Sequence, residues 1–459
     1  MAEGRLSSGH AALDEILDGG LPGNGISVLM GLPGTGKTIL AQQYAFRNAD
    51  PERPVVYFST LSEPLEKIVR FGQSLRFFTA AAVGKSLFYQ DLGQAASRDG
   101  LPGVAEQIMA TLTERRPGLV VIDGFRALQI FADGEAAYRR FLHQLAGRLS
   151  VFPAASLWVG IYEATDISLL PEFAVADAII ELRTVRTGQR DIRFLEVRKL
   201  RGSAFRSGQH AYRLDEGGLH LFPRLADIRP GQDLRLSEER IPFGVPGLDE
   251  MLAGGLFPGS TTMIAGPAGV GKTVLGLHFI VGGAARGEPG VIATLQENPA
   301  QLQRILGTFG YSTEDQPVDV LYRSPVDIYI DEWVYDLLDT VERTSASRVL
   351  LDSLGDLQDA ALDETRFREF MYSLSQRFAR RGTSVVMTCE TPQLPGLPAL
   401  SPFAASHLCD NVVVLNQRIN QGGIYREVSI TKSRASAHDQ AIRQFTISSQ
   451  GISIDGVAG

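Results

Sequence analysis

Apolar residues in this chain gather in short continuous runs that alternate with longer segments of helical spacing. In the first half the runs occupy residues 27–30, 55–58, 119–123, 156–162 and 178–182. In the second half they occupy residues 262–265, 291–295, 349–352, 384–388 and 412–415. Continuous rather than alternating apolar runs are typical of strands that are covered on both faces. We therefore predict an α/β fold in each half, with a largely parallel sheet flanked by helices.

The second half of the chain repeats the first. The segment SSGHAALDEILDGGLPGN (7–24) resembles PFGVPGLDEMLAGGLFPGS (242–260), and each leads into an apolar run. Offsets of 235, 234, 229 and 233 residues separate four pairs of landmarks, which are Lys37 and Lys272, Glu63 and Glu297, Asp123 and Asp352, and Arg201 and Arg434. Such a nearly constant offset indicates a tandem duplication, with domains predicted at 1–230 and 231–459. The polar stretch at 225–242 is the expected linker.

Composition narrows the class of protein. The chain has 459 residues, a formal net charge of −8 and two cysteines, Cys389 and Cys409. A negative net charge gives no general attraction to nucleic acid or to anionic lipid, so we expect neither as a partner. No signal peptide is readable, and no run approaches the roughly 20 apolar residues of a membrane helix. These features predict a cytoplasmic protein in a reducing compartment.

Each half carries a phosphate-binding loop, GLPGTGKT at 31–38 and GPAGVGKT at 266–273. In this pattern backbone N–H groups and a helix N-terminus surround the phosphates, while the lysine reaches the β- and γ-phosphates and the threonine binds Mg²⁺. Each loop follows an apolar run and precedes a segment of helical spacing, as the pattern requires. The predicted ATP-binding residues are Gly34, Thr35, Gly36, Lys37, Thr38, Gly269, Val270, Gly271, Lys272 and Thr273.

Carboxylates follow the predicted strands of both halves. Asp123 and Asp352 each end an apolar run, where a phosphate-loop enzyme holds the Mg²⁺ shell together with Thr38 and Thr273. Glu63 and Glu297 follow the apolar run that comes after each loop and its helical segment, and they are candidates to orient or deprotonate the attacking water. The alternatives are an aspartate that caps a turn and an exposed carboxylate before a proline.

Taken together, these motifs resemble the KaiC family of circadian-clock ATPases and autokinases, within the RecA-like P-loop proteins. The resemblance spans nearly the whole chain and includes the LDE…GGL segments, both loops, two Lys-x-Arg segments and SAHDQAIRQFTIS at 436–448. It implies a homohexameric double ring with ATP and Mg²⁺ between subunits. By motif match, the cations that complete a neighbour's site would be Lys199, Arg201, Lys432 and Arg434; read alone, they are solvated strand ends.

The chain departs from the family pattern at two places. Where the family has a Glu-Glu pair, we match Ser62-Glu63 in the first copy and Gln296-Glu297 in the second. A glutamine can orient water but cannot accept its proton, so slow hydrolysis is expected. Where the family has a phosphorylated Ser-Thr pair, this chain has Ser406-His407. Ser406 is the candidate phosphoacceptor, with an ordinary loop hydroxyl as the alternative. His407 is a second candidate, for proton transfer or as a transient acceptor, with an ordinary surface histidine as the alternative.

Three functions therefore stay open on the sequence alone. The first is an ATPase and serine autokinase that acts in signalling or timing with an unknown partner protein. The second is an ATP-gated scaffold with little turnover, favoured by the missing glutamates. The third is a RecA-like DNA-processing motor, against which the negative net charge stands.

Overall fold

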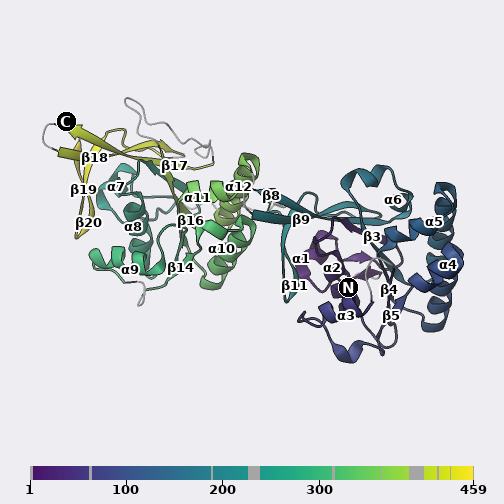
Figure 1. Cartoon of the computed structure of the whole chain (residues 1–459). Coiled ribbons are helices and arrows are strands. Elements are labelled where there is room, and N and C mark those ends of the chain that lie inside the picture. Colours follow the sequence, from purple (N-terminus) through teal and green to yellow (C-terminus); the bar gives the residue numbers. More distant parts are fainter. Residues whose placement is uncertain are drawn as a thin grey trace. The chain divides into compact units, whose positions relative to one another are not determined.

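A computed structural model describes residues 4–60, 65–187, 190–225, 238–312, 316–361, 363–391, 408–420, 423–434 and 436–457. The chain divides into two compact units, Met1–Arg224 and Leu225–Gly459. Each unit contains one nine-stranded sheet, and helices cover both faces of that sheet (Figure 1). The α/β prediction for both halves is therefore confirmed.

The first unit places its phosphate loop after a central strand. Its sheet order is β11-β10-β9-β8-β3-β7-β6-β4-β5, in which the strands from β8 to β5 are parallel and β9, β10 and β11 are antiparallel. The strands are β1 Arg5–Leu6, β2 Leu21–Pro22, β3 Ile26–Gly31, β4 Val55–Ser59, β5 Leu87–Asp91, β6 Leu119–Asp123, β7 Ala155–Ile161, β8 Ala178–Thr187, β9 Arg190–Leu200, β10 His210–Asp215 and β11 Gly218–Phe222. The helices are α1 Ala11–Ile16, α2 Lys37–Arg47, α3 Leu65–Gly72, α4 Gly93–Arg115, α5 Glu135–Leu149 and α6 Pro171–Val175, with 3₁₀ turns η1 Ala80–Ala82, η2 Phe125–Phe131 and η3 Ala164–Ser168.

The second unit has the same topology. Its sheet order is β14-β13-β15-β16-β12-β17-β18-β19-β20, again with six parallel strands followed by three antiparallel ones. The strands are β12 Thr261–Gly266, β13 Gly290–Thr294, β14 Val318–Tyr322, β15 Arg348–Asp352, β16 Ser384–Glu390, β17 Asn411–Asn420, β18 Gly423–Ser433, β19 Arg443–Ser448 and β20 Gly451–Val457. The helices are α7 Pro246–Met251, α8 Lys272–Ala284, α9 Pro299–Thr308, α10 Ile330–Thr344, α11 Leu354–Ala360 and α12 Glu364–Arg381, with the 3₁₀ turn η4 Pro325–Asp327.

An apolar layer of buried side chains lies on each face of each sheet, between the sheet and the helices that cover it. In β4, Val55 and Tyr57 face the layer that contains α1, α2 and α3, whereas Val56 and Phe58 face the layer that contains α4, α5 and α6. Successive residues of a strand point to opposite faces, so a continuous apolar run is buried on both sides. The second unit repeats this arrangement with α7, α8 and α9 on one face and α10, α11 and α12 on the other.

Among the described residues, no helix combines the length and the apolar character that a membrane crossing requires.

Candidate functional site

Each phosphate loop joins a buried central strand to a helix. The first loop lies between β3 and α2, and the second lies between β12 and α8. The residue before each helix is a glycine in the left-handed region, Gly36 at φ +87° and Gly271 at φ +115°. A Cβ at Gly36 would come within 2.6 Å of Leu214, and one at Gly271 within 2.7 Å of Ile447. Both the backbone conformation and the close packing therefore require glycine at this position.

The loop lysines fold back over their own loops. Lys37 Nζ donates a hydrogen bond to the carbonyl of Leu32 at 2.8 Å, and Lys272 Nζ donates to the carbonyl of Pro267 at 2.8 Å. Burial lowers the pKa of Lys37 to about 8, although the neighbouring Asp123 carboxylate opposes that shift. Burial also lowers the pKa of Lys272. Each ammonium group is thus partly dehydrated and forms no ion pair within the residues that the structure describes, so a bound polyphosphate would stabilise its charged form.

A hydroxyl and a carboxylate meet beside each loop. Thr38 Oγ1 donates to Asp123 Oδ2 at 3.0 Å, and Thr273 Oγ1 donates to Asp352 at 3.1 Å. The described residues contain no cluster of three or more His, Cys, Asp or Glu side chains that could hold a metal. A threonine and an aspartate fit Mg²⁺ bound mainly through phosphate oxygens and water, because Mg²⁺ rarely uses an all-protein cage. The donor set therefore fits the predicted Mg²⁺.

Different strands orient the two aspartates. In the first unit the hydroxyl of Tyr57 on β4 donates to Asp123 Oδ2 at 2.7 Å. In the second unit Thr388 Oγ1 on β16 donates to Asp352 Oδ1 at 2.6 Å. Sequence reasoning missed both hydroxyls, because each reaches its aspartate from a strand that is distant along the chain but adjacent in the sheet.

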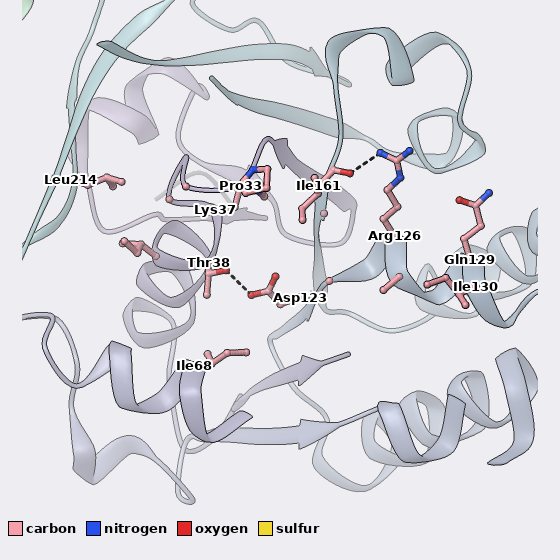
Figure 2. Close-up of a pocket in the computed structure, with 16 residues that line it drawn as sticks. Pro33, Lys37, Thr38, Ile68, Asp123, Arg126, Gln129, Ile130, Ile161 and Leu214 are labelled. Atoms are coloured by element: carbon pink, nitrogen blue, oxygen red, sulfur yellow. Dashed lines mark hydrogen bonds between the residues drawn. The ribbon is translucent and has the colours of Figure 1, made fainter. Parts of the chain in front are cut away.

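The first loop opens into a cavity of about 810 Å³ (Figure 2). Lys37, Thr38 and Asp123 line one part of it, while η2 and the end of β7 line another. Arg126, on η2, points to the carbonyl of Ile161 in Figure 2 and donates to it at 2.8 Å. The sequence analysis did not single out Arg126, although it stands three residues after the predicted Mg²⁺ aspartate.

The second site has a carboxyl group with a strongly shifted pKa. Burial, followed by the nearby Asp352 carboxylate, raises the pKa of Glu297 to about 7. Glu297 Oε2 is buried and has no hydrogen-bond partner within the part of the chain that the structure describes. Its neighbour Gln296 is exposed and donates through Nε2 to Asp356 at 2.9 Å. A carboxyl with a pKa near 7 beside a phosphate loop is suited to accept a proton from water.

The pairing of strands in the two sheets shows which residues after β4 and after β13 occupy corresponding positions in the two units. Ser59 pairs with Asp123 and Thr294 pairs with Asp352, so Ser59 and Thr294 occupy equivalent positions. Counting three residues onward leads to Ser62 in the first copy and Glu297 in the second. By this count Ser62 stands at the sequence position of Glu297, whereas the match of Glu63 with Glu297 stays a prediction. Glu63 itself lies outside the described residues, as do Ser406 and His407.

The four cations of the Lys-x-Arg segments lie near the amino ends of the parallel strands, whereas the phosphate loops follow the carboxyl ends. Lys199 is paired with Ile179 near the start of β8, whereas the loop follows Gly31, which pairs with Leu182 further along that strand. The corresponding second-unit pairs are Val412 with Lys432 and Asn411 with Ser433, at the start of β17. The structure therefore does not bring these cations to the phosphate loop of their own unit.

Both pairs of cations make matching contacts within their units. Lys199 Nζ donates to the carbonyl of Phe173 at 3.2 Å, and Lys432 Nζ donates to the carbonyl of Cys409 at 2.7 Å. Arg201 lies 3.3 Å from Asp177, and Arg434 lies 3.7 Å from Asp410. The side chains of the two arginines are 59% and 56% exposed, so they can still reach a neighbouring molecule.

The fold and the two sites define tandem RecA-like P-loop ATPase domains. Comparison with known proteins agrees, since the model of the KaiC ATPase family matches residues 6–226 and 241–457. The chain belongs to the KaiC family. It is 28% identical over 457 residues to the circadian clock oscillator protein KaiC of Picosynechococcus. This alignment covers 96% of the chain and 88% of the relative. It is 27% identical over 454 residues to the protein of the same name from Synechococcus elongatus, covering 95% and 86%.

Proposed function

We propose that the chain binds Mg²⁺-ATP in both units, hydrolyses it chiefly in the second, and transfers phosphate slowly to Ser406. The observation that carries this proposal is the side chain of Glu297, a half-buried carboxyl with a raised pKa beside Asp352 and the second loop. The first unit has the lysine, threonine and aspartate but has Ser62 at the position of Glu297.

The residues of the second site divide the chemistry between them. Lys272 compensates charge on the phosphates, and Thr273 and Asp352 would hold Mg²⁺, which neutralises charge on the β- and γ-phosphates when bound. In hydrolysis the oxygen of water forms a bond to the γ-phosphorus as the bond to the bridging oxygen of ADP breaks, and Glu297 accepts the water proton. In autophosphorylation Ser406 would supply the attacking oxygen and Glu297 would accept its proton.

A ring assembly would supply the missing cations. Lys199, Arg201, Lys432 and Arg434 lie too far along the sheet to serve their own loops, yet cations from a neighbour can stabilise charge on the transferring phosphate. We propose a homohexameric double ring in which these residues reach the adjacent subunit's ATP. Their matching positions and contacts in the two units support a shared role.

A scaffold that is gated by ATP is the second candidate. The serine at the position of Glu297 in the first unit and the exposed Gln296 in the second both favour binding without rapid turnover. A scaffold would change its assembly when ATP binds but would release little phosphate. Nothing in the described residues favours the DNA motor, and binding of DNA at physiological salt would be the observation to support it.

Phosphate release and intact mass after incubation with Mg²⁺-ATP test the proposal. We expect steady turnover in the wild type, strong loss in Lys272→Ala, and a smaller loss in Lys37→Ala. The exposed Lys85 provides a matched control, because Lys85→Ala removes a lysine that does not line the cavity. A mass increase of one phosphate that disappears in Ser406→Ala and in Lys272→Ala would support the kinase step. Absence of both turnover and added phosphate in the wild type would leave only the scaffold.

A further inference from the structure

The cavity beside the first phosphate loop extends past the residues that the nucleotide motif explains. Its far wall consists of η2 and the end of β7, including Arg126, Ile130 and Ile161 (Figure 2). Arg126 is the basic residue on that wall, and it shares the cavity with Lys37 and Thr38. A cationic side chain that faces a phosphate loop across a cavity can contact the outer phosphate of a bound nucleotide.

The strand order puts Arg126 near the expected position of the γ-phosphate. In the sheet β7 lies between β3, which leads into the loop, and β6, which ends at Asp123. Since these strands are parallel, their carboxyl ends lie next to one another along one side of the sheet. Arg126 follows Asp123 by three residues and donates to the carbonyl of Ile161 at the end of β7. The guanidinium is therefore held at the carboxyl end of β7, on the wall of the cavity that the loop and Asp123 also line.

The contacts of Arg126 leave part of its hydrogen-bonding capacity unused. Nη1 donates to the carbonyl of Ile161 and, at 3.0 Å, to Asp166 Oδ2. A guanidinium has five N–H donors. Nε and Nη2 make no hydrogen bond within the described residues, and the side chain is 40% exposed. The ring of Tyr162 lies 5.3 Å away and supports the guanidinium from one face. Arg126 is thus held in place with donors still available to an anion.

The second unit has a glycine in place of the arginine at this position. Gly355 corresponds to Arg126, because each stands three residues after the aspartate that ends the β6 or β15 strand. Ile161 pairs with Gly31, and Glu390 pairs with the equivalent Gly266. The second site therefore has Gly355 where the first has Arg126, and it has a carboxylate, Glu390, where the first has Ile161. An anionic γ-phosphate is favoured beside the cation and disfavoured beside the carboxylate.

We propose that Arg126 binds the γ-phosphate of ATP within its own subunit and makes the first site selective for ATP over ADP. This inference rests on the proposed function, because it requires that the first loop binds nucleotide. ADP lacks the phosphate that Arg126 would contact, so only ATP gains from the guanidinium. The first site would then retain ATP, whereas the second site has Gly355 at this position and gains no such contact with the γ-phosphate.

Calorimetric titration of the Lys272→Ala chain tests this inference, because only the first loop then binds. The dissociation constants of ADP and of a non-hydrolysable ATP analogue are measured with Mg²⁺ before and after Arg126→Ala. A hydrogen bond between charged groups corresponds to about a 10- to 100-fold change in affinity, so the preference for the ATP analogue should fall by that factor. ADP affinity should change little. Arg139→Ala is the matched control, since Arg139 pairs with Glu135 on the surface and does not line the cavity.

Each outcome has a distinct meaning. Arg126→Lys should keep part of the preference, because it retains the charge but not the planar group of donors. It also replaces Arg126→Ala if circular dichroism shows that the alanine variant is unfolded. An unchanged ratio of the two dissociation constants in both Arg126 variants would overturn this inference alone. If the Lys272→Ala chain binds neither nucleotide, nucleotide binding by the first loop fails instead, and the proposed function fails with it.

Discussion

At the scale of single residues, the two sites share a lysine, a threonine and an aspartate but differ in the groups around them. The sequence was sufficient to place Thr38 with Asp123 and Thr273 with Asp352, because a loop and a strand end have known positions in a parallel sheet. It was not sufficient to predict Tyr57 or Thr388. Those hydroxyls reach their aspartates only because β4 lies beside β6 and β16 lies beside β15.

The shifted pKa of Glu297 predicts how turnover depends on pH. The pKa is raised to about 7, so the carboxyl is mostly protonated at pH 6 and mostly ionised at pH 8. Only the ionised form accepts a proton, and turnover should therefore rise as pH increases through 7. Loss of a general base typically lowers the rate by ~10²–10⁴-fold, which we expect for Glu297→Gln together with a flat pH profile. Steady-state phosphate release measures both effects.

Glu342→Gln is the control for this prediction, because Glu342 pairs with Arg381 on the surface of the second unit. It should leave both the rate and the pH profile unchanged. An identical rise through pH 7 in the Glu297→Gln variant would assign the titration to another group.

The lowered pKa of Lys37 predicts proton uptake on nucleotide binding. With a pKa of about 8, Lys37 is mostly neutral at pH 9, and a bound polyphosphate would favour its charged form. In the Lys272→Ala chain, binding should therefore take up close to one proton at pH 9 and almost none at pH 7. Calorimetry in buffers of different ionisation enthalpy measures this number. Lys37→Arg should bind without uptake, since arginine stays charged; uptake that persists in that variant would contradict the assignment to Lys37.

At the scale of elements, the ten strands predicted from continuous apolar runs are all present. The antiparallel strands β9, β10 and β11 and their second-unit counterparts were not predicted. The pattern in β9 mixes exposed and buried positions, for example exposed Arg198 beside buried Val197. Such a strand buries fewer of its side chains than a central strand, so it lacks the continuous apolar run from which the other strands were predicted.

The junction of β3, the first loop and α2 allows a test of loop geometry. Gly34 and Gly36 both have positive φ, +81° and +87°, but a Cβ added at Gly36 would come within 2.6 Å of Leu214, whereas one added at Gly34 would meet nothing within 4 Å. Forcing a left-handed conformation on alanine costs about 1 kcal/mol, which should lower the free energy of unfolding in both alanine variants. Gly36→Ala should lose more, because Leu214 must also move.

Denaturant unfolding without nucleotide measures this difference and uses Gly34→Ala as the matched control. Equal losses for the two variants would show that the contact with Leu214 does not restrict the loop.

At the scale of the whole molecule, the duplication gives two sheets of identical strand order that carry different sites. The sequence predicted the duplication because landmarks recur at offsets of 229 to 235 residues. It could not predict that the Lys-x-Arg cations lie at the amino ends of the parallel strands, away from their own loops. That position depends on how the strands pair in the folded sheet. In the proposed ring, these cations would reach the nucleotide of a neighbouring chain.

The central claim is that a second-unit site of one chain works with the cations of another. It is tested most directly by mixing Lys272→Ala, which keeps Arg434, with Arg434→Ala, which keeps Lys272, before Mg²⁺-ATP is added. Each variant alone should turn over slowly. In an equal mixture about a quarter of the interfaces of a cyclic assembly combine an intact loop with an intact arginine, so phosphate release should rise to about a quarter of the second-unit rate of the wild type. A mixture that releases phosphate only at the average rate of the two variants would contradict the shared site.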